Sequence, residues 1–118
     1  MRTQLAKKRV LTASRDDALA GIYAAARDSV VGRLIYRKWI PSERRFVKEK
    51  RDVVPLKFGL TSRNNLVIYC ADYGAHKQTK AFLVSGLESF TPGKMRVSPP
   101  YKIEFDNIKR VVSRFVKV

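Results

Sequence analysis

The chain has 118 residues, of which 25 are lysine or arginine and 10 are aspartate or glutamate, so its formal net charge at pH 7 is +15. This length predicts one domain, and six Phe, five Tyr and one Trp can fill its core without a metal or a disulfide. The charge exceeds the roughly 2 to 8 charges of an ordinary small domain, which predicts a polyanionic partner.

The counts of cysteine and histidine exclude several kinds of site. The single Cys70 excludes an internal disulfide, and together with the single His76 it cannot form a zinc site without carboxylate ligands. No apolar run is long enough to cross a membrane, and no apolar stretch follows the first basic residues as in a secretion signal. We therefore expect a cytoplasmic protein of a reducing compartment, with no cofactor, no metal and no membrane partner.

The first thirty residues divide into two parts. Residues 1–13 carry four basic side chains and no acidic one, which is typical of a basic arm. Ser14 followed by Asp17 fits the start of a helix. Apolar residues then recur at helical spacing, so we expect one amphipathic packing helix over 15–30. Its apolar positions are Leu19, Ile22, Tyr23, Ala26 and Val30.

From Gly32 onward, β-branched and aromatic residues alternate with charged ones, a pattern that predicts strands. Pro55 and Gly59 interrupt the second of them and predict a bend there. Short antiparallel strands in succession predict a small barrel. The expected strands cover 33–39, 44–60, 66–73, 79–84 and, after a loop over 91–93, 95–97.

The C-terminal segment allows two interpretations. Its apolar residues Ile108, Val111, Val112 and Phe115 have helical spacing behind Asp106 as an N-cap, whereas their β-branched character favours a strand. We favour the helix. The expected fold is therefore mainly β with α, a barrel of about five strands preceded by one helix and followed by another.

Most of the positive charge falls on the expected strands, since residues 31–62 carry nine basic and three acidic side chains. The densest run, 44–51, is also typical of an edge strand that charge protects from further pairing. Basic side chains of neighbouring strands can converge beside exposed aromatic rings, which predicts a surface for single-stranded nucleic acid. The aromatic candidates, each of which also fits a core position, are Tyr36, Trp39, Tyr69 and Tyr73. The candidate contacts are Arg33, Tyr36, Arg37, Lys38, Arg44, Arg45, Lys48, Lys50, Arg51, Arg63, Tyr69, Lys77 and Lys80.

No catalytic constellation is apparent in the sequence. His76 lies in an expected turn with no Ser, Cys or carboxylate beside it, and Cys70 lies in an apolar strand where thiols are inert. Glu104 and Asp106 lack a third carboxylate for a metal-dependent nuclease. The glycines are scattered singly and form no phosphate-binding loop. We therefore expect a binding protein and not an enzyme.

Three segments follow the pattern of a known family. Residues 34–36 read Leu-Ile-Tyr, residues 51–55 fit R-x-V-x-P, and residues 66–69 with 80–90 fit L-V-x-Y followed by R-x-F-x-L-[DS]-R-I-x-x-[VF]. In this way 33–90 resembles the WYL domain, a small Sm-like (SH3-type) barrel of bacterial transcription regulators and defence-system accessory proteins. The family's Trp-Tyr-Leu is replaced by Asn64-Asn65-Leu66, and Gly86 replaces a basic residue. Residues 103–111 fit the closing motif about as well.

The resemblance implies binding of nucleic acid or a nucleotide-like ligand at Tyr36, Arg51, Tyr69 and Lys80. Family members usually add a winged-helix DNA-binding domain in front, for which the residues before 33 are too few. We therefore expect a stand-alone regulator, encoded by a phage or mobile element, that binds single strands in preference to duplexes. The alternative is a protein-interaction module that docks on an acidic surface of a polymerase or nuclease. DNA, RNA and nucleotide ligands stay open, as does homodimer formation through barrel edges.

Overall fold

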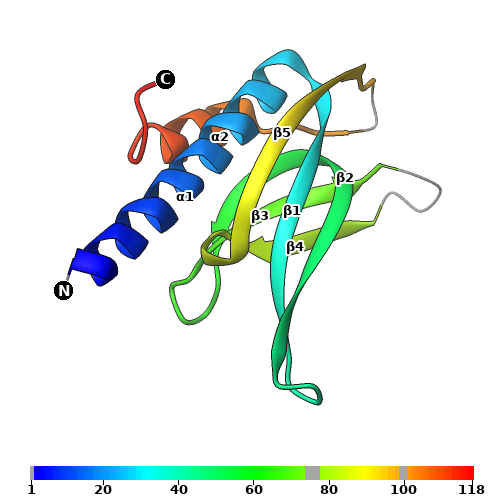
Figure 1. Ribbon diagram of the computed structural model, residues 1–118. Helices are drawn as coiled ribbons and strands as arrows, with labels where there is room; N and C mark the ends of the chain where they lie inside the picture. The colour runs from blue at the N-terminus through cyan, green and yellow to red at the C-terminus, as the bar shows by residue number, and fades with distance from the viewer. Residues whose placement is uncertain (1, 74–77, 99–100) are drawn as a thin grey trace.

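The computed structural model describes residues 2–73, 78–98 and 101–118, with side chains from Ser14 onward (Figure 1). These residues form a mainly β structure with a helix before and a helix after the strands, which confirms the expected fold class. The elements in chain order are α1 (Arg2–Asp28), β1 (Val30–Ile40), β2 (Arg45–Leu60), β3 (Leu66–Asp72), β4 (Thr79–Leu83), the 3-10 helix η1 (Val84–Gly86), β5 (Leu87–Arg96) and α2 (Phe105–Val112).

The five strands form one antiparallel sheet in the order β4-β3-β2-β1-β5. β4 and β5 are consecutive in the chain, are joined only by the three residues of η1, and yet lie at opposite edges of the sheet. So short a connection can join the two edges only if the sheet rolls up, and Figure 1 shows this curl. The sheet therefore has the strongly curved form expected of a small barrel.

Helix α1 begins thirteen residues earlier than the sequence pattern suggested, because it includes the segment expected to be a basic arm. Residues 2–20 contain neither glycine nor proline, so nothing in the sequence interrupts the helix before Ser14. The helix ends at Asp28, since Ser29 adopts the left-handed conformation with φ 54°. Val30 consequently belongs to β1 and not to the helix. No helix of the described residues is long and apolar enough to span a membrane.

Helix α1 buries one face against the inside of the rolled sheet. The predicted apolar positions Leu19, Ile22 and Ala26 are buried in the main core. The helix packs most extensively on β5, where Gly21 lies directly against the main-chain carbonyl of Phe90. A Cβ atom at position 21 would overlap that carbonyl. Close approach of the helix to β5 therefore depends on a residue without a side chain.

The last strand and the C-terminal segment differ from the expectation in detail. β5 covers Leu87–Arg96 rather than 95–97, and the expected loop at Thr91-Pro92-Gly93 lies inside it. Proline is tolerated there because β5 is an edge strand. Residues 105–112 form α2 and not a strand, whereas residues 80–90 span the end of β4, η1 and the start of β5. The helical interpretation is confirmed, although the N-cap is Glu104 and not Asp106, which lies in the first turn.

Helix α2 is attached to β2 by hydrogen bonds at an irregularity in the strand. The register of β2 against β3 shifts between Pro55 and Lys57, and nearby the Glu104 N–H donates to the Leu56 carbonyl at 2.8 Å. The Asn107 side chain pairs with the main chain of Phe58, accepting from its N–H at 2.7 Å and donating to its carbonyl at 3.3 Å. The Asn107 amide therefore takes the place that another strand would occupy.

Replacing Asn107 by alanine is expected to lower the free energy of unfolding by about 1 to 3 kcal/mol, because two partly buried main-chain groups lose their partners. Asn107→Asp should also destabilise, since the carboxylate keeps the acceptor but faces the Phe58 carbonyl without a donor. Urea unfolding measures both. Ser113→Ala removes an exposed hydrogen bond from the end of α2 and should change stability by less than about 0.5 kcal/mol. Equal effects of all three variants would contradict this role.

Candidate nucleic-acid interface

The β1–β2 hairpin sorts the predicted contact residues onto two faces. β1 and β2 pair in one unbroken register from Gly32 opposite Val53 to Ile40 opposite Arg45. Directly opposed residues share a face, and successive residues alternate between faces. We call the face of the hairpin on which Leu34 is buried in the core the inner face. We call the opposite face the outer face. The inner face also carries Tyr36, Lys38, Arg45, Glu49 and Arg51, and the outer face carries Arg33, Arg37, Trp39, Phe46, Lys48 and Lys50.

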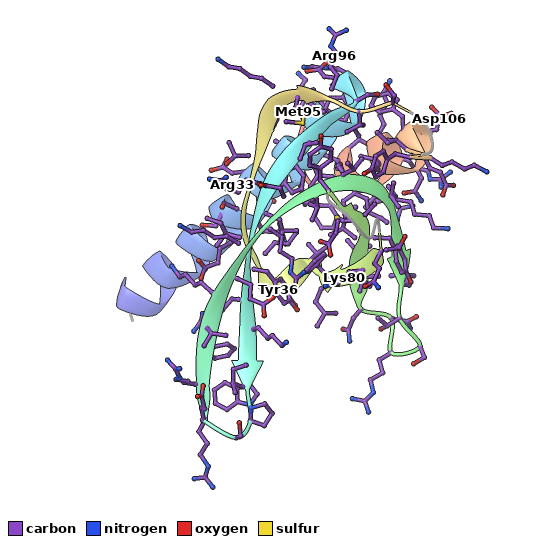
Figure 2. All side chains as sticks on the ribbon, turned by 90° about the vertical axis from the view of Figure 1, so that its right-hand side faces the viewer. Arg33, Tyr36, Lys80, Met95, Arg96 and Asp106 are labelled. Atoms are coloured by element: carbon purple, nitrogen blue, oxygen red, sulfur yellow. The ribbon has the colours of Figure 1, made fainter. Side chains whose placement is uncertain are left out.

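Three of the four positions implied by the WYL resemblance come together on the inner face. Tyr36 packs edge-on against Phe82, with ring centroids 5.3 Å apart. Phe82 and Lys80 share the inner face of β4, and Lys80 lies 3.3 Å from the carboxylate of Asp72. Arg51 contacts the same carboxylate at 3.5 Å. In Figure 2, Tyr36 and Lys80 lie close together within the bend of β2.

Around Arg51, charges of both signs form what we call the inner cluster: Lys38, Glu49, Arg51, Asp72 and Lys80. The Arg51 guanidinium lies between Glu49, at 3.4 Å, and Asp72, at 3.5 Å. Lys38 approaches Glu49 at 3.7 Å. The Nε of Arg51 is buried and has no hydrogen-bond partner among the described residues. Because the three cations share two carboxylates, an anionic ligand at the inner cluster has to compete with internal partners.

Tyr69, the fourth position of the resemblance, lies on the opposite face of the sheet. Its neighbours Ile68 and Cys70 are buried in the main core, so Tyr69 points to the other side of β3. There it is half-buried, opposite Lys57, whose Nζ is 6.0 Å from the centroid of the ring. The structure therefore separates Tyr69 from Tyr36, Arg51 and Lys80.

Most of the remaining predicted contacts lie on a projecting ribbon, residues 37–48, which we call the hairpin arm. Among the described residues, β5 pairs with β1 only as far as Tyr36, and β3 pairs with β2 only from Val53 onward. The strands of the arm consequently pair only with each other, and Figure 1 shows the arm extending away from the helices and the rest of the sheet. Of the predicted contacts, the arm carries Arg37, Lys38, Arg44, Arg45 and Lys48.

The other predicted contacts are spread around the arm and the body. Lys50 lies on the outer face at the base of the arm. Arg33 lies further into the sheet and pairs with Asp52 at 3.3 Å. Arg63 is exposed in the turn between β2 and β3, away from the arm. Lys77 lies outside the described residues.

The outer face of the arm contains an aromatic pair of which the sequence indicated only one member. Trp39 lies opposite Phe46 with ring centroids 4.8 Å apart, and the Arg37 guanidinium lies 4.0 Å from the centroid of the Phe46 ring. Trp39 is 47 % exposed and Phe46 51 % exposed. Phe46 was not among the candidates, although pairing around the turn after Ile40 would have placed it opposite Trp39.

Nearly all the acidic side chains form ion pairs within the protein. Eight of the ten acidic side chains lie within 4.0 Å of a basic one: Asp16, Asp28, Glu43, Glu49, Asp52, Asp72, Glu88 and Glu104. Eleven basic side chains have no such carboxylate among the described residues: Arg37, Arg44, Lys50, Arg63, Lys94, Arg96, Lys102, Lys109, Arg110, Arg114 and Lys117. The surplus positive charge therefore faces solvent.

Cys70 is fully buried, and burial together with the nearby charge of Asp72 raises the pKa of its thiol. A thiol held protonated in this way is a poor nucleophile. No group of three or more His, Cys, Asp or Glu side chains that could hold a metal ion occurs in the described part of the chain.

The native protein is therefore expected to react with a coloured disulfide reagent only as fast as β3 opens, whereas the protein in denaturant should react at once. Absorbance of the released thiolate measures both rates. Reaction of the native protein at the rate of free cysteine would contradict the burial of Cys70.

No protein-family model, curated protein or solved structure matches this chain. The WYL resemblance stays a prediction from the sequence motifs. The function is therefore argued from the charges, the exposed rings and the geometry of the two faces.

Proposed function

We propose that this protein binds single-stranded nucleic acid and acts as a non-enzymatic regulator in the cytoplasm. The observation that carries the proposal is the set of eleven basic side chains that have no carboxylate within 4.0 Å in the described part of the chain. Phosphate groups supply the missing negative charge, and they release condensed counterions when lysine or arginine neutralises them. The regulatory role rests on the resemblance of residues 33–90 to the WYL domain.

Single strands are favoured over duplexes because free cations occur beside exposed aromatic rings. Arg37 lies on Phe46, and both Phe46 and the neighbouring Trp39 are about half exposed. In a duplex the faces of the bases are already stacked on one another, whereas an unpaired strand offers them to a protein ring. The same contacts tolerate any base, so we expect weak sequence preference.

The proposal is tested by equilibrium binding of labelled single-stranded and duplex DNA and RNA of equal length, at low salt. We expect dissociation constants of about 10 μM or tighter for single strands, within or below the range of non-specific binding, and weaker binding of the duplexes. Polyglutamate serves as a polyanion without bases. Absence of binding to every nucleic acid, or affinity for polyglutamate equal to that for single strands, would contradict the proposal.

A protein partner is the second candidate, and a groove along α2 favours it. The groove, about 390 Å³ in volume, lies between the end of β2 and α2. Its apolar lining includes Leu60 and Phe115, both exposed, and Arg110 and Arg114 also line it. Such a surface fits an acidic peptide with apolar side chains. Binding of a purified polymerase or nuclease that persists after nuclease treatment, with no affinity for free nucleic acid, would favour this candidate.

A further inference from the structure

The hairpin arm combines three features on one face. Trp39 and Phe46 form a cross-strand aromatic pair, and the Arg37 guanidinium lies over the Phe46 ring, 4.0 Å from its centroid. The adjacent positions of the same face are Lys48 and Lys50. Neither strand of the arm has an acidic residue on the outer face, and Glu88 of β5 contacts Lys48 there at 3.0 Å.

A structural role explains part of this arrangement. A two-stranded ribbon is marginally stable in water, and an aromatic cross-strand pair stabilises it. That role requires the two rings to contact each other. It does not account for Arg37 on the Phe46 ring or for Lys50 further along the same face, neither of which has a carboxylate within 4.0 Å among the described residues. Exposed rings bordered by free cations match the chemistry of a nucleotide, whose flat base is joined to a phosphate.

We propose that the hairpin arm is a base-stacking element: an unpaired base of a single strand stacks on the exposed surface of Trp39, whose ring Phe46 supports edge-to-face at 60°, while flanking phosphates contact Arg37 and Lys50. This inference rests on the proposed function and assigns the stacking step to one place on the molecule. The arm is suited to first contact because its free cations are exposed, whereas Arg51 in the inner cluster is held between two carboxylates.

The chain offers a direct probe of this step, because Trp39 is its only tryptophan. We would titrate the unmodified protein with oligothymidylate and with an abasic deoxyribose-phosphate strand of the same length, exciting tryptophan selectively. If a base stacks on Trp39, oligothymidylate should quench the Trp39 fluorescence strongly. The abasic strand should quench it little, although both strands carry the same number of phosphates. Equal quenching by the two strands, or none by oligothymidylate while it binds, would overturn the inference.

Substitutions test the same contact by affinity, measured as anisotropy of a labelled oligothymidylate. Trp39→Ala and Phe46→Ala should each weaken binding about 5- to 150-fold, the range for losing one stacked base, whereas Trp39→Phe should retain most of the affinity. The matched control is Phe115→Ala, since Phe115 is also exposed and also has an arginine on its ring, Arg15 at 4.9 Å, but lies outside the arm. Its affinity should not change.

The outcomes separate this inference from the proposed function. Full affinity of Trp39→Ala and Phe46→Ala would reject the stacking role and leave nucleic-acid binding intact. If no nucleic acid binds the unmodified protein, the proposed function itself fails. If Trp39→Ala disturbs the arm, as circular dichroism would show, the titration of the unmodified protein with the abasic strand still decides between stacking and charge alone.

Discussion

The affinity for a single strand is expected to fall by about two to three orders of magnitude as monovalent salt rises from about 50 to about 200 mM. Six basic side chains occur from Arg37 to Lys50 inclusive, and for three of them, Lys38, Arg45 and Lys48, a phosphate has to replace a carboxylate of a surface ion pair. If each neutralises one phosphate, the logarithm of the association constant should fall with the logarithm of salt concentration with a slope of about −4. Anisotropy titrations at four or more salt concentrations give the slope, and a slope near zero would remove the electrostatic basis of the proposal.

Single substitutions show which cations contribute to that slope. Lys50 is exposed and has no carboxylate within 4.0 Å among the described residues, so Lys50→Ala should make the slope shallower by about 0.7. Lys117, also exposed and unpaired within the described chain, lies at the C-terminal end and serves as the matched control. Equal changes in the two variants would mean that the charge acts from the whole surface and not from the arm.

Replacing Gly21 by valine is expected to lower the free energy of unfolding by about 3 kcal/mol or more, because the new side chain overlaps the main chain of β5. Main-chain atoms cannot rotate away as the end of a flexible side chain can. The helix would therefore have to move off β5, and the contacts of its buried residues Leu19 and Ile22 would loosen. Urea unfolding followed by circular dichroism measures the loss.

The neighbouring exposed residue of the same helix provides the control. Ala20→Val introduces the same side chain at an exposed position, so it should cost less than about 1 kcal/mol through helix propensity alone. If Gly21→Val and Ala20→Val had equal effects, the close approach of α1 to β5 would not limit stability.

Hydrophobic periodicity predicted most of what the two helices contribute to the core, although Phe115, which has the same spacing, lies beyond the end of α2 and is exposed. Leu19, Ile22 and Ala26 in α1 and Ile108 and Val112 in α2 are buried at the spacing that the sequence indicated. The ends of helices and strands were harder to predict, because each depends on the backbone conformation of a single residue, which local sequence patterns do not reveal. Ser29 ends α1 with a positive φ that serine seldom adopts, and Pro92 continues β5 because the strand lies at a sheet edge.

The candidate site was predictable by strand alternation but not by charge. An odd number of positions separates Tyr36 from Trp39, so a regular strand presents them on opposite faces. The structure agrees, because Tyr36 packs against the core and Trp39 is exposed. The sequence did not indicate that Arg51 would be held by Glu49 and Asp72, since Asp72 comes from another strand whose register depends on the irregularity after Pro55. Which charged side chains contact each other depends on the strand register, so it cannot be obtained by counting charged residues.

The packing of α1 on β5 also has a consequence for the order of folding. The pairs β1–β2, β2–β3 and β3–β4 join strands adjacent in the chain, whereas β5 returns to β1 across the whole sheet. Contacts between distant segments form slowly because a long loop must close first. During synthesis α1 emerges from the ribosome before the five strands, but its main partner emerges only when residues 87–96 are complete. The apolar stripe around Leu19 and Ile22 thus lacks its main partner strand until residue 96 has been made, and we expect docking of the helix on β5 to be a late step of folding.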